Sequence, residues 1–433
     1  MEMTPNLSRR SFLKHSAATG MALTAPLVVP ASVLGLGAPA PSERITMGVI
    51  GYGGRCAAIL PHFLMFDDLR CLAVSDCRSN RLAAAKKVVD THNANEDCAA
   101  YPDFRDLLAR SDIDAVLIAT GDRWHTPLSI LAARSGKDVY CEKPVSLAIG
   151  ESRAMADTMA RYGTVYQAGH QRRSVGSYAF QVEAARSGMI GKVHTIICQV
   201  WEGPTVALDT PRAVPEGFDY DMWLGPTPWH PYVPAYVSGW NYFWDVGAGP
   251  IIGMGCHYTD IAQWGLQRDD TGPVLYEGTA TWKPDAFSET PVLADCTCTY
   301  ADGVKIIIRS SGLFQDRYIR FVGSDGWIQV DDQTNKVTAE PASILQARNI
   351  AAPSWAQTGD HVRNWLDCIK SRKQPICHPE SAHRATTICH AANIGLRLGR
   401  SLKWDPQAER FLDDPQANAM LHRAARAPWS VIF

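Results

Sequence analysis

The sequence predicts an α/β chain of two domains, a doubly wound parallel sheet followed by an α+β domain with a large open, mostly antiparallel sheet. Two observations support this prediction. Over residues 44–165, short apolar runs alternate with helix-like stretches of about ten to fifteen residues, which is typical of parallel sheets with helices on both faces. Farther along, the strand candidates are longer, and turn sequences such as ADG and GSDG favour antiparallel hairpins.

The first domain spans residues 44–165, and its expected strands are residues 44–51, 71–76, 114–120 and 138–143. The second domain spans residues 166–433, with strands expected within residues 193–203, 273–282, 294–311 and 317–330. Amphipathic stretches predict C-terminal helices that pack back onto the first domain, at residues 360–372 and 380–400. An open antiparallel sheet leaves one face to be covered, which predicts a homo-oligomer, either a dimer or a tetramer.

The composition argues against two classes of ligand. The chain has 433 residues, 46% of them hydrophobic, and a formal net charge of −2. No basic block or stripe stands out, so no nucleic-acid partner is expected. Cysteines and histidines occur within residues 377–390, but helical spacing spreads them around the axis, and no C-x-x-C or H-E-x-x-H occurs. We therefore expect no metal site.

Residues 1–40 have the pattern of a twin-arginine signal peptide. Arg9 and Arg10 lie within SRRSFLK and precede an apolar stretch at residues 21–36. Prolines interrupt this stretch, and a membrane-spanning helix needs about 20 predominantly apolar residues, so a signal segment fits better. A basic N-terminal tail is the alternative. The signal predicts export by the twin-arginine machinery, to the periplasm or otherwise out of the cytoplasm.

A glycine-rich turn follows the first expected strand. Its sequence GYGGRC begins at Gly51 and fits G-x-G-x-x-G except at the last position, where the small Cys56 stands. Asp76 closes the next strand 20 residues after Cys56, where it can accept hydrogen bonds from an adenosine ribose. This predicts an NAD-binding Rossmann domain, with NADP left open because Arg78 can accommodate a 2′-phosphate. A strand-end aspartate that only caps a turn is the alternative.

Two further stretches suggest catalysis. The sequence CEKPVS places Lys143 at the carboxyl end of a strand, where residues of a doubly wound sheet face the ligand, and a lysine there can exchange a proton with a substrate hydroxyl. In GAGPIIGMGCHYTDIAQWGL, helical spacing places His257 and Asp260 near one face. The alternatives are a surface lysine beside a turn proline, and a buried histidine with satisfied hydrogen bonds.

The order of these motifs resembles the glucose–fructose oxidoreductase / inositol dehydrogenase / MocA (Gfo/Idh/MocA) family, over nearly all of residues 44–400. The resemblance implies a Rossmann domain, an open-sheet domain, and action on sugars or cyclitols with NAD(P). It also implies that Lys143 is the catalytic lysine of the E-K-P motif and His257 the catalytic histidine. One position differs, because the family's aspartate four residues before the histidine is here Gly253, and Gly247-Ala248-Gly249 stands for the glycine triplet. The lost role could pass to His257, His170 or Asp245, or the chemistry could differ.

From these motifs we expect the following sites. The cofactor residues are Gly51, Tyr52, Gly53, Gly54, Arg55, Asp76, Arg78, Thr120, His125, Glu142 and Lys143. Ten aromatic residues between Phe218 and Trp244 suggest stacking on sugar rings, although such a segment could instead pack against a partner subunit. The substrate residues expected are Lys143, His170, Arg172, Tyr236, Trp244, His257 and Asp260.

Export constrains the chemistry, because no soluble NAD pool exists outside the cytoplasm. The cofactor must be bound during folding and regenerated in place. The first prediction is therefore an exported sugar oxidoreductase with a tightly bound, internally recycled cofactor. The alternative is a redox-neutral glycoside hydrolase, lyase or epimerase that oxidises the sugar transiently, and a third possibility is a non-catalytic carbohydrate-binding protein.

Overall fold

The computed structural model describes residues 40–247, 249–310, 312–346 and 359–429. The chain divides into two units after Arg44, and the fold below is that of the unit from Ile45 onward. Residues 1–39 of the expected signal peptide and Ala248 of the glycine-rich run lie outside the described residues.

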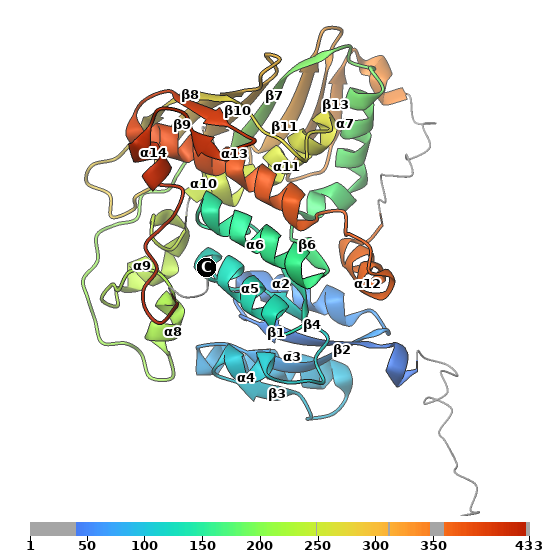
Figure 1. Cartoon of the computed structure of the whole chain (residues 1–433), viewed down its shortest axis with the longest axis vertical. Helices are drawn as coiled ribbons and strands as arrows, with labels where there is room; N and C mark the ends of the chain where they lie inside the picture. The colour runs from blue at the N-terminus through green and yellow to red at the C-terminus, as the bar shows by residue number, and fades with distance from the viewer. Residues whose placement is uncertain (1–39, 248, 311, 347–358, 430–433) are drawn as a thin grey trace, which may run out of the picture. The chain divides into compact units, whose positions relative to one another are not determined.

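Six parallel strands form the first sheet, in the order β3-β2-β1-β4-β5-β6 (Figure 1). They are β1 (Ile45–Ile50), β2 (Leu69–Ser75), β3 (Ala99–Tyr101), β4 (Ala115–Ile118), β5 (Asp138–Cys141) and β6 (Tyr166–Ala168). The order reverses between β1 and β4, and doubly wound sheets bind ligands at the carboxyl ends of the strands beside such a point. β6 continues the sheet past residue 165, where the sequence placed the end of this domain.

Helices cover both faces of this sheet. One face packs against α2 (Gly54–Leu64), α3 (Ser79–Asn93) and α12 (His361–Ser371). The other packs against α4 (Phe104–Leu108), α5 (His125–Arg134) and α6 (Ile149–Tyr162). Side chains alternate along each strand, so that Val49 and Leu117 face the first group of helices while Ile50 and Ile118 face the second. Because both faces are covered, these strands are continuous apolar runs in the sequence.

The second sheet has the order β13-β12-β11-β7-β10-β9-β8-β14-β15. Its strands are β7 (Val193–Val200), β8 (Leu275–Thr281), β9 (Leu293–Thr299), β10 (Lys305–Ser310), β11 (Tyr318–Gly323), β12 (Trp327–Asp331), β13 (Val337–Glu340), β14 (Leu402–Asp405) and β15 (Arg410–Phe411). β7 and β10 run parallel, and the other described pairs are antiparallel. The fold class predicted from the sequence is therefore confirmed.

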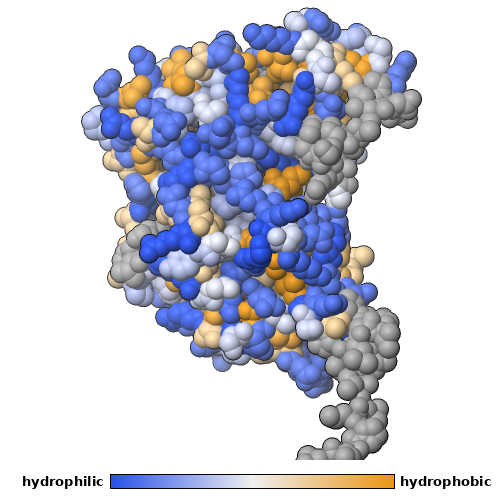
Figure 2. Space-filling model, turned by 45° about the vertical axis from the view of Figure 1, so that its right-hand side comes forward, coloured by the Kyte–Doolittle hydropathy of each residue, from blue (hydrophilic) through white to orange (hydrophobic). Residues whose placement is uncertain are grey.

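One face of the second sheet is buried and the other is not. The buried face packs against α7 (Gly176–Arg186), α11 (Gly255–Leu266) and α13 (Pro379–Leu398) (Figure 1). On the opposite face, half-buried side chains alternate with the core residues, as at Ile197 of β7 and Ile307 of β10, which are register partners. Figure 2 shows hydrophobic residues between hydrophilic ones over the part of the surface that this domain forms.

Short elements and a tail complete the unit. These elements are η3 (Asp122–Trp124), η4 (Gln171–Ser174), α8 (Tyr220–Leu224), α9 (Pro234–Ser238), η5 (Trp240–Tyr242), α10 (Gly249–Gly253), η6 (Ala342–Gln346) and α14 (Pro415–Ala419). The tail after α14 runs beside α8 and α9 (Figure 1). The Arg426 backbone N–H donates to the Pro226 carbonyl at 2.7 Å, and the Trp429 ring lies 4.8 Å from the Trp124 ring, edge to face. The tail thereby contacts both domains.

The twelve cysteines are all free thiols. No described helix is long and apolar enough to cross a membrane. Within the described ranges, no group of three or more His, Cys, Asp or Glu side chains is placed to hold a metal ion.

Candidate active site

The glycine-rich turn after β1 needs its first glycine. Gly51 has a φ of +87°, and a Cβ there would meet Cγ2 of Thr120 at 2.6 Å and its Cα at 2.9 Å. Gly53 then precedes α2, and a Cβ on Gly54 would meet no atom within 4 Å. The N-terminus of α2 therefore lies open, with unpaired backbone N–H groups that can receive an anionic group such as a pyrophosphate.

A cavity of about 770 Å³ begins at this turn. Seven of the predicted cofactor residues line it: Gly51, Gly53, Gly54, Arg55, Asp76, Arg78 and Thr120. The other four, Tyr52, His125, Glu142 and Lys143, do not line it. The cavity lies at the carboxyl ends of β1, β2 and β4, where the topology places a ligand.

Asp76 is held by the turn itself. Its carboxylate accepts the backbone N–H of Tyr52 at 2.7 Å and that of Arg78 at 2.8 Å. A carboxylate has about four lone-pair sites, so two remain for ribose hydroxyls. The Arg78 guanidinium lies 3.9 Å from the centre of the Phe218 ring, and Arg81 lines the same cavity. Both a ribose hydroxyl and a 2′-phosphate thus find partners at this end.

The aromatic segment between Phe218 and Trp244 forms a wall of this cavity. Its rings at Trp223, Tyr232 and Trp240 line the cavity. Backbone hydrogen bonds attach the segment to the rim, from Ser79 N–H to Gly217 O at 2.8 Å and from Asp219 N–H to Cys77 O at 2.8 Å. We call residues 217–241 the cover.

Few rings of the aromatic segment are free to contact a substrate. Tyr236, a predicted substrate residue, is 3% exposed and stacks on His230 at 4.1 Å. The rings of Tyr220, Trp223 and Phe243 belong to the same small apolar core. Trp244 lies outside the cover, where its ring centre is 3.9 Å from the guanidinium carbons of both Arg397 and Arg423.

Lys143 connects the two domains. Its Nζ donates a hydrogen bond to the backbone carbonyl of Gly253, the last residue of α10, at 2.7 Å. The carbonyl of the residue that replaces the family's aspartate therefore accepts the bond. A Cβ on Gly253 would meet no atom within 4 Å, so space for a side chain remains.

Glu142 is buried beside the cleft. Its carboxylate lies 2.9 Å from the Arg55 guanidinium of α2 and accepts a hydrogen bond from Gln171 of η4 at 2.7 Å. It thereby connects the start of α2 to the segment that follows β6. Since Arg55 lines the dinucleotide cavity, Glu142 acts on that cavity through Arg55.

His257 is a neutral, buried imidazole. Burial lowers the pKa of His257 well below its usual value, and the positive charges of Arg172 and Lys143 lower it further. Its side chain is 4% exposed, and no described group hydrogen-bonds its Nδ1. A neutral imidazole with an open nitrogen can accept a proton.

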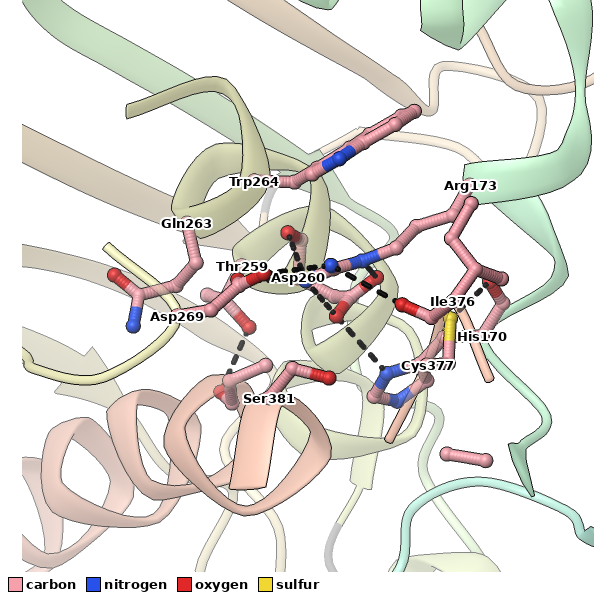
Figure 3. A network of polar contacts seen from close by, with 12 residues as sticks. His170, Arg173, Thr259, Asp260, Gln263, Trp264, Asp269, Ile376, Cys377 and Ser381 are labelled. Carbon is pink, nitrogen blue, oxygen red and sulfur yellow. Dashed lines mark hydrogen bonds and ion pairs between the residues drawn. The ribbon is translucent and has the colours of Figure 1, made fainter. Parts of the chain in front are cut away.

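Figure 3 shows the ionic network around Arg173 and Asp260. Arg173 binds the Asp260 carboxylate with two hydrogen bonds of 2.8 Å and also binds Asp269 at 2.7 and 2.8 Å. Nδ1 of His170 lies 3.4 Å from Asp260, and the His170 ring centre is 5.6 Å from that of His257. Burial lowers the pKa of His170, but the Asp260 carboxylate outweighs this and raises it to about 9. Asp260 therefore holds a charged His170 against His257.

Arg172 and His125 have fixed partners. Arg172 donates to the Asp332 carboxylate at 2.5 Å, which also accepts the Tyr178 hydroxyl at 2.6 Å. His125 lies at the start of α5, with Nδ1 2.6 Å from the Pro144 carbonyl. Burial lowers the pKa of His125 to about 4, so the ring is neutral at pH 7. It fixes the turn that carries Lys143 and does not reach the cavity.

Sequence analysis did not assign a role to Asp122 or Arg123. Both are buried, and burial raises the pKa of Asp122 to about 7, against the charges of Lys143, Arg123 and Arg423. Arg123 lines the dinucleotide cavity. They lie in η3, which begins four residues after β4 ends, so their place beyond the carboxyl end of a central strand is a sequence signal for them.

Two family models together match most of the chain. The family model described as "Oxidoreductase family, C-terminal alpha/beta domain" matches residues 190–431, and the companion model described as "Oxidoreductase family, NAD-binding Rossmann fold" matches residues 45–170. The chain belongs to the Gfo/Idh/MocA oxidoreductase family. The predicted NAD-binding Rossmann domain is confirmed. A twin-arginine translocation signal matches residues 6–26, which indicates export through that pathway, as Arg9 and Arg10 predict.

Curated relatives are similar to part of this Gfo/Idh/MocA chain. A glycosyl hydrolase family 109 protein of Saccharopolyspora erythraea is 35% identical over 172 residues, which cover 35% of this chain and 36% of that protein. The myo-inositol 2-dehydrogenase of Thermotoga maritima is 31% identical over 150 residues, which cover 35% of this chain and 43% of that protein. The chain thus spans well under half the length of the curated relatives it matches.

Solved structures share the fold. The myo-inositol 2-dehydrogenase of Lactobacillus plantarum aligns with a TM-score of 0.62 and 19% identity, over 83% of this chain and 99% of that one. The aldose–aldose oxidoreductase of Caulobacter crescentus also aligns with a TM-score of 0.62, at 17% identity, over 83% of this chain and 99% of that one. At these identities the likeness is one of fold.

The ion pair of His170 predicts a pH dependence of stability. The pKa of His170 is raised in the folded state to about 9, above about 6.5 for an unperturbed histidine, so its contribution is fully present below pH 6.5. It is lost as the pH rises through 9. We expect His170→Asn to lower the thermal midpoint at pH 6 and to reduce its fall between pH 6.5 and 9.

Thermal unfolding at a series of pH values tests this, with His194→Asn as the control, because His194 is exposed. Parallel curves for wild type and His170→Asn between pH 6.5 and 9 would contradict a charged His170.

Proposed function

We propose that this protein is an exported oxidoreductase that acts on a hydroxyl group of a sugar, sugar derivative or cyclitol with a tightly held NAD. The single observation behind the proposal is the covered cleft of about 770 Å³ at the carboxyl ends of β1, β2 and β4. Its volume lies within the range of about 300–1,000 Å³ for small-molecule sites. The cover separates this cleft from solvent along one wall, which favours slow cofactor release.

The cleft suits NAD at each end. The open N-terminus of α2 would receive the pyrophosphate, and Asp76 would accept the ribose hydroxyls and repel a 2′-phosphate. NAD is therefore the favoured cofactor. NADP is the alternative, because Arg78 and Arg81 line the same end. When bound, NAD accepts a hydride from a hydroxyl-bearing carbon.

Lys143 and His257 would handle the substrate hydroxyl. An ammonium has three donors, and the bond to Gly253 uses one, so Lys143 retains two that can hold the substrate oxygen. The neutral His257 is suited to accept the hydroxyl proton at its open Nδ1. The charged His170, fixed by Asp260, faces His257 and helps to keep it neutral before it accepts that proton.

Export requires that the cofactor be recycled. We propose that a sugar substrate is oxidised and that a second, carbonyl-bearing substrate is reduced by the same bound cofactor. The folded protein crosses the membrane by the twin-arginine machinery, so the cofactor can be taken up in the cytoplasm and retained.

A redox-neutral glycoside hydrolase, lyase or epimerase is the second candidate. Two observations favour it, the glycosyl hydrolase family 109 relatives and the glycine at position 253. In that reaction the sugar carbon is oxidised transiently, the adjacent C–H becomes acidic, and the hydride returns after elimination.

A lysine variant tests the proposal. Lys143→Ala should reduce turnover by about 10²–10⁴-fold while leaving the bound NAD in place, because Lys143 does not line the dinucleotide cavity. Turnover is measured by nicotinamide fluorescence with a panel of aldoses, cyclitols and glycosides, with the exposed Lys192→Ala as control. Persistent reduction by a free sugar supports net oxidation, and glycoside turnover without it supports the second candidate. If no compound changes the fluorescence or is turned over, both catalytic candidates fail and a non-catalytic carbohydrate-binding protein remains.

We also propose that the half-buried face of the second sheet forms a homo-oligomer, a dimer or a tetramer. Ile197 and Ile307 lie side by side on this face. Ile307→Glu should lower the mass measured by light scattering, because a carboxylate would be buried at the contact. Leu412→Glu, at an exposed leucine of another surface, is the control. A monomeric wild type would contradict the proposal.

A further inference from the structure

A second cavity borders the dinucleotide cavity. Its volume is about 240 Å³, smaller than most small-molecule sites, so it suits a single ring-sized group. Among the residues that line it are Arg123, Leu147, Glu151, Trp244, Asp245 and Arg423. Arg123 borders this cavity and the dinucleotide cavity alike.

Three features connect the cavity to Lys143. Leu147 follows the Lys143-Pro144 turn along the chain, and Trp244 and Asp245 precede α10, whose last residue accepts the Lys143 hydrogen bond. In addition, the charges of Lys143 and Arg423 both act on Asp122. A substrate held by Lys143 can therefore extend into this cavity.

Two arginines at this cavity bind backbone carbonyls. Arg423, from the C-terminal tail, donates to the Trp244 carbonyl, and Arg123 donates to the Trp223 carbonyl. Three other guanidinium groups instead bind carboxylates: Arg153 with Glu380 and Glu409, Arg172 with Asp332, and Arg173 with Asp260 and Asp269.

Unused donors remain on both arginines at the cavity. Nε and Nη2 of Arg423 and Nη1 of Arg123 are buried, and no described group accepts a hydrogen bond from them. The Arg123 side chain is 4% exposed. Burial lowers the pKa of each to about 10, since charge compensation is incomplete. A buried guanidinium donor without an acceptor is costly, so an anionic ligand would stabilise this arrangement.

Acidic groups also act on these arginines. The charges of Glu151, Asp245 and Asp122 favour the charged form of Arg423, but none of the three accepts a hydrogen bond from its Nε or Nη2. Burial raises the pKa of Glu151, and it raises the pKa of Asp122 to about 7, so Asp122 is only partly ionised at neutral pH. Glu151 also accepts the Leu147 backbone N–H at 3.1 Å. The Arg397 guanidinium, 3.9 Å from the Trp244 ring, adds a further positive charge.

We propose that the second cavity receives one monosaccharide unit of the substrate and that Arg423 and Arg123 bind an anionic group on it, a carboxylate or a phosphate ester. The ring of Trp244 packs against the guanidinium groups of Arg397 and Arg423. In this proposal Trp244 positions Arg397 and Arg423 and does not stack on the sugar. The substrate class is thus an acidic sugar. This inference rests on the proposed action on sugars.

Calorimetry on the cofactor-loaded full chain tests it with three probes, glucuronate, glucose 6-phosphate and glucose. At least one anionic probe should bind about tenfold or more tightly than glucose, as expected for charge-assisted hydrogen bonds, and the two anions distinguish carboxylate from phosphate. Arg423→Gln should abolish this preference, and Arg423→Lys should retain part of it.

Arg110→Gln is the control. Arg110 binds the Asp112 carboxylate and lines neither cavity, so this variant should keep the preference. Equal binding of all three probes, an unchanged preference in Arg423→Gln, or an equal loss in Arg110→Gln would overturn the inference. If an anionic sugar binds without reducing the nicotinamide, the proposed reaction fails and the inference stands. If only neutral sugars bind and reduce the nicotinamide, the proposed reaction stands and the inference fails.

Discussion

The structure depends on how the cover is attached to the rim of the parallel sheet. Two backbone hydrogen bonds connect residues 217–219 to the loop after β2, and the indole N–H of Trp124 donates to the Met222 carbonyl at 2.9 Å. Behind these contacts the aromatic rings form their own small core. Opening the cleft exposes that core and breaks these bonds together, so a dinucleotide taken up during folding would leave slowly. This gives a physical reason why an exported chain can use a cytoplasmic cofactor.

The polar groups of the site are of two kinds, those that are paired with an opposite charge and those that retain unused hydrogen-bond donors. Arg173, Asp260 and Asp269 satisfy one another and fix His170 against His257, which makes them a frame. Lys143 instead keeps unused donors, and its partner is only a backbone carbonyl. The proposed reaction centre therefore combines groups that have unused hydrogen-bonding capacity with a network of ion pairs that holds them, which is the arrangement expected where a ligand completes the hydrogen bonding.

Local patterns predicted the parallel sheet and the dinucleotide turn, because Gly51 and Asp76 act within one strand–turn–helix unit. β6 was missed at the domain boundary, since three residues give no periodicity. The sequence showed the aromatic segment, but it did not predict that the segment lines the dinucleotide cavity. Composition does not say which cavity a ring faces. No sequence pattern identified Arg423 as a site residue. It lies near the site only because the C-terminal tail folds back over the cavity. The resemblance pointed to Lys143 and His257. It could not predict that Lys143 donates to the carbonyl oxygen of Gly253, because a backbone contact leaves no pattern in the sequence.

Exchange of the bound dinucleotide tests the central claim most directly. The protein is exported, purified without added cofactor, and mixed with excess isotopically labelled NAD, and bound label is followed by mass spectrometry. The covered cleft predicts close to one unlabelled dinucleotide per chain and slow exchange, which Trp223→Ala should accelerate because it removes a wall of the cleft. A chain that arrives empty, or one that exchanges its cofactor at once, would contradict the account.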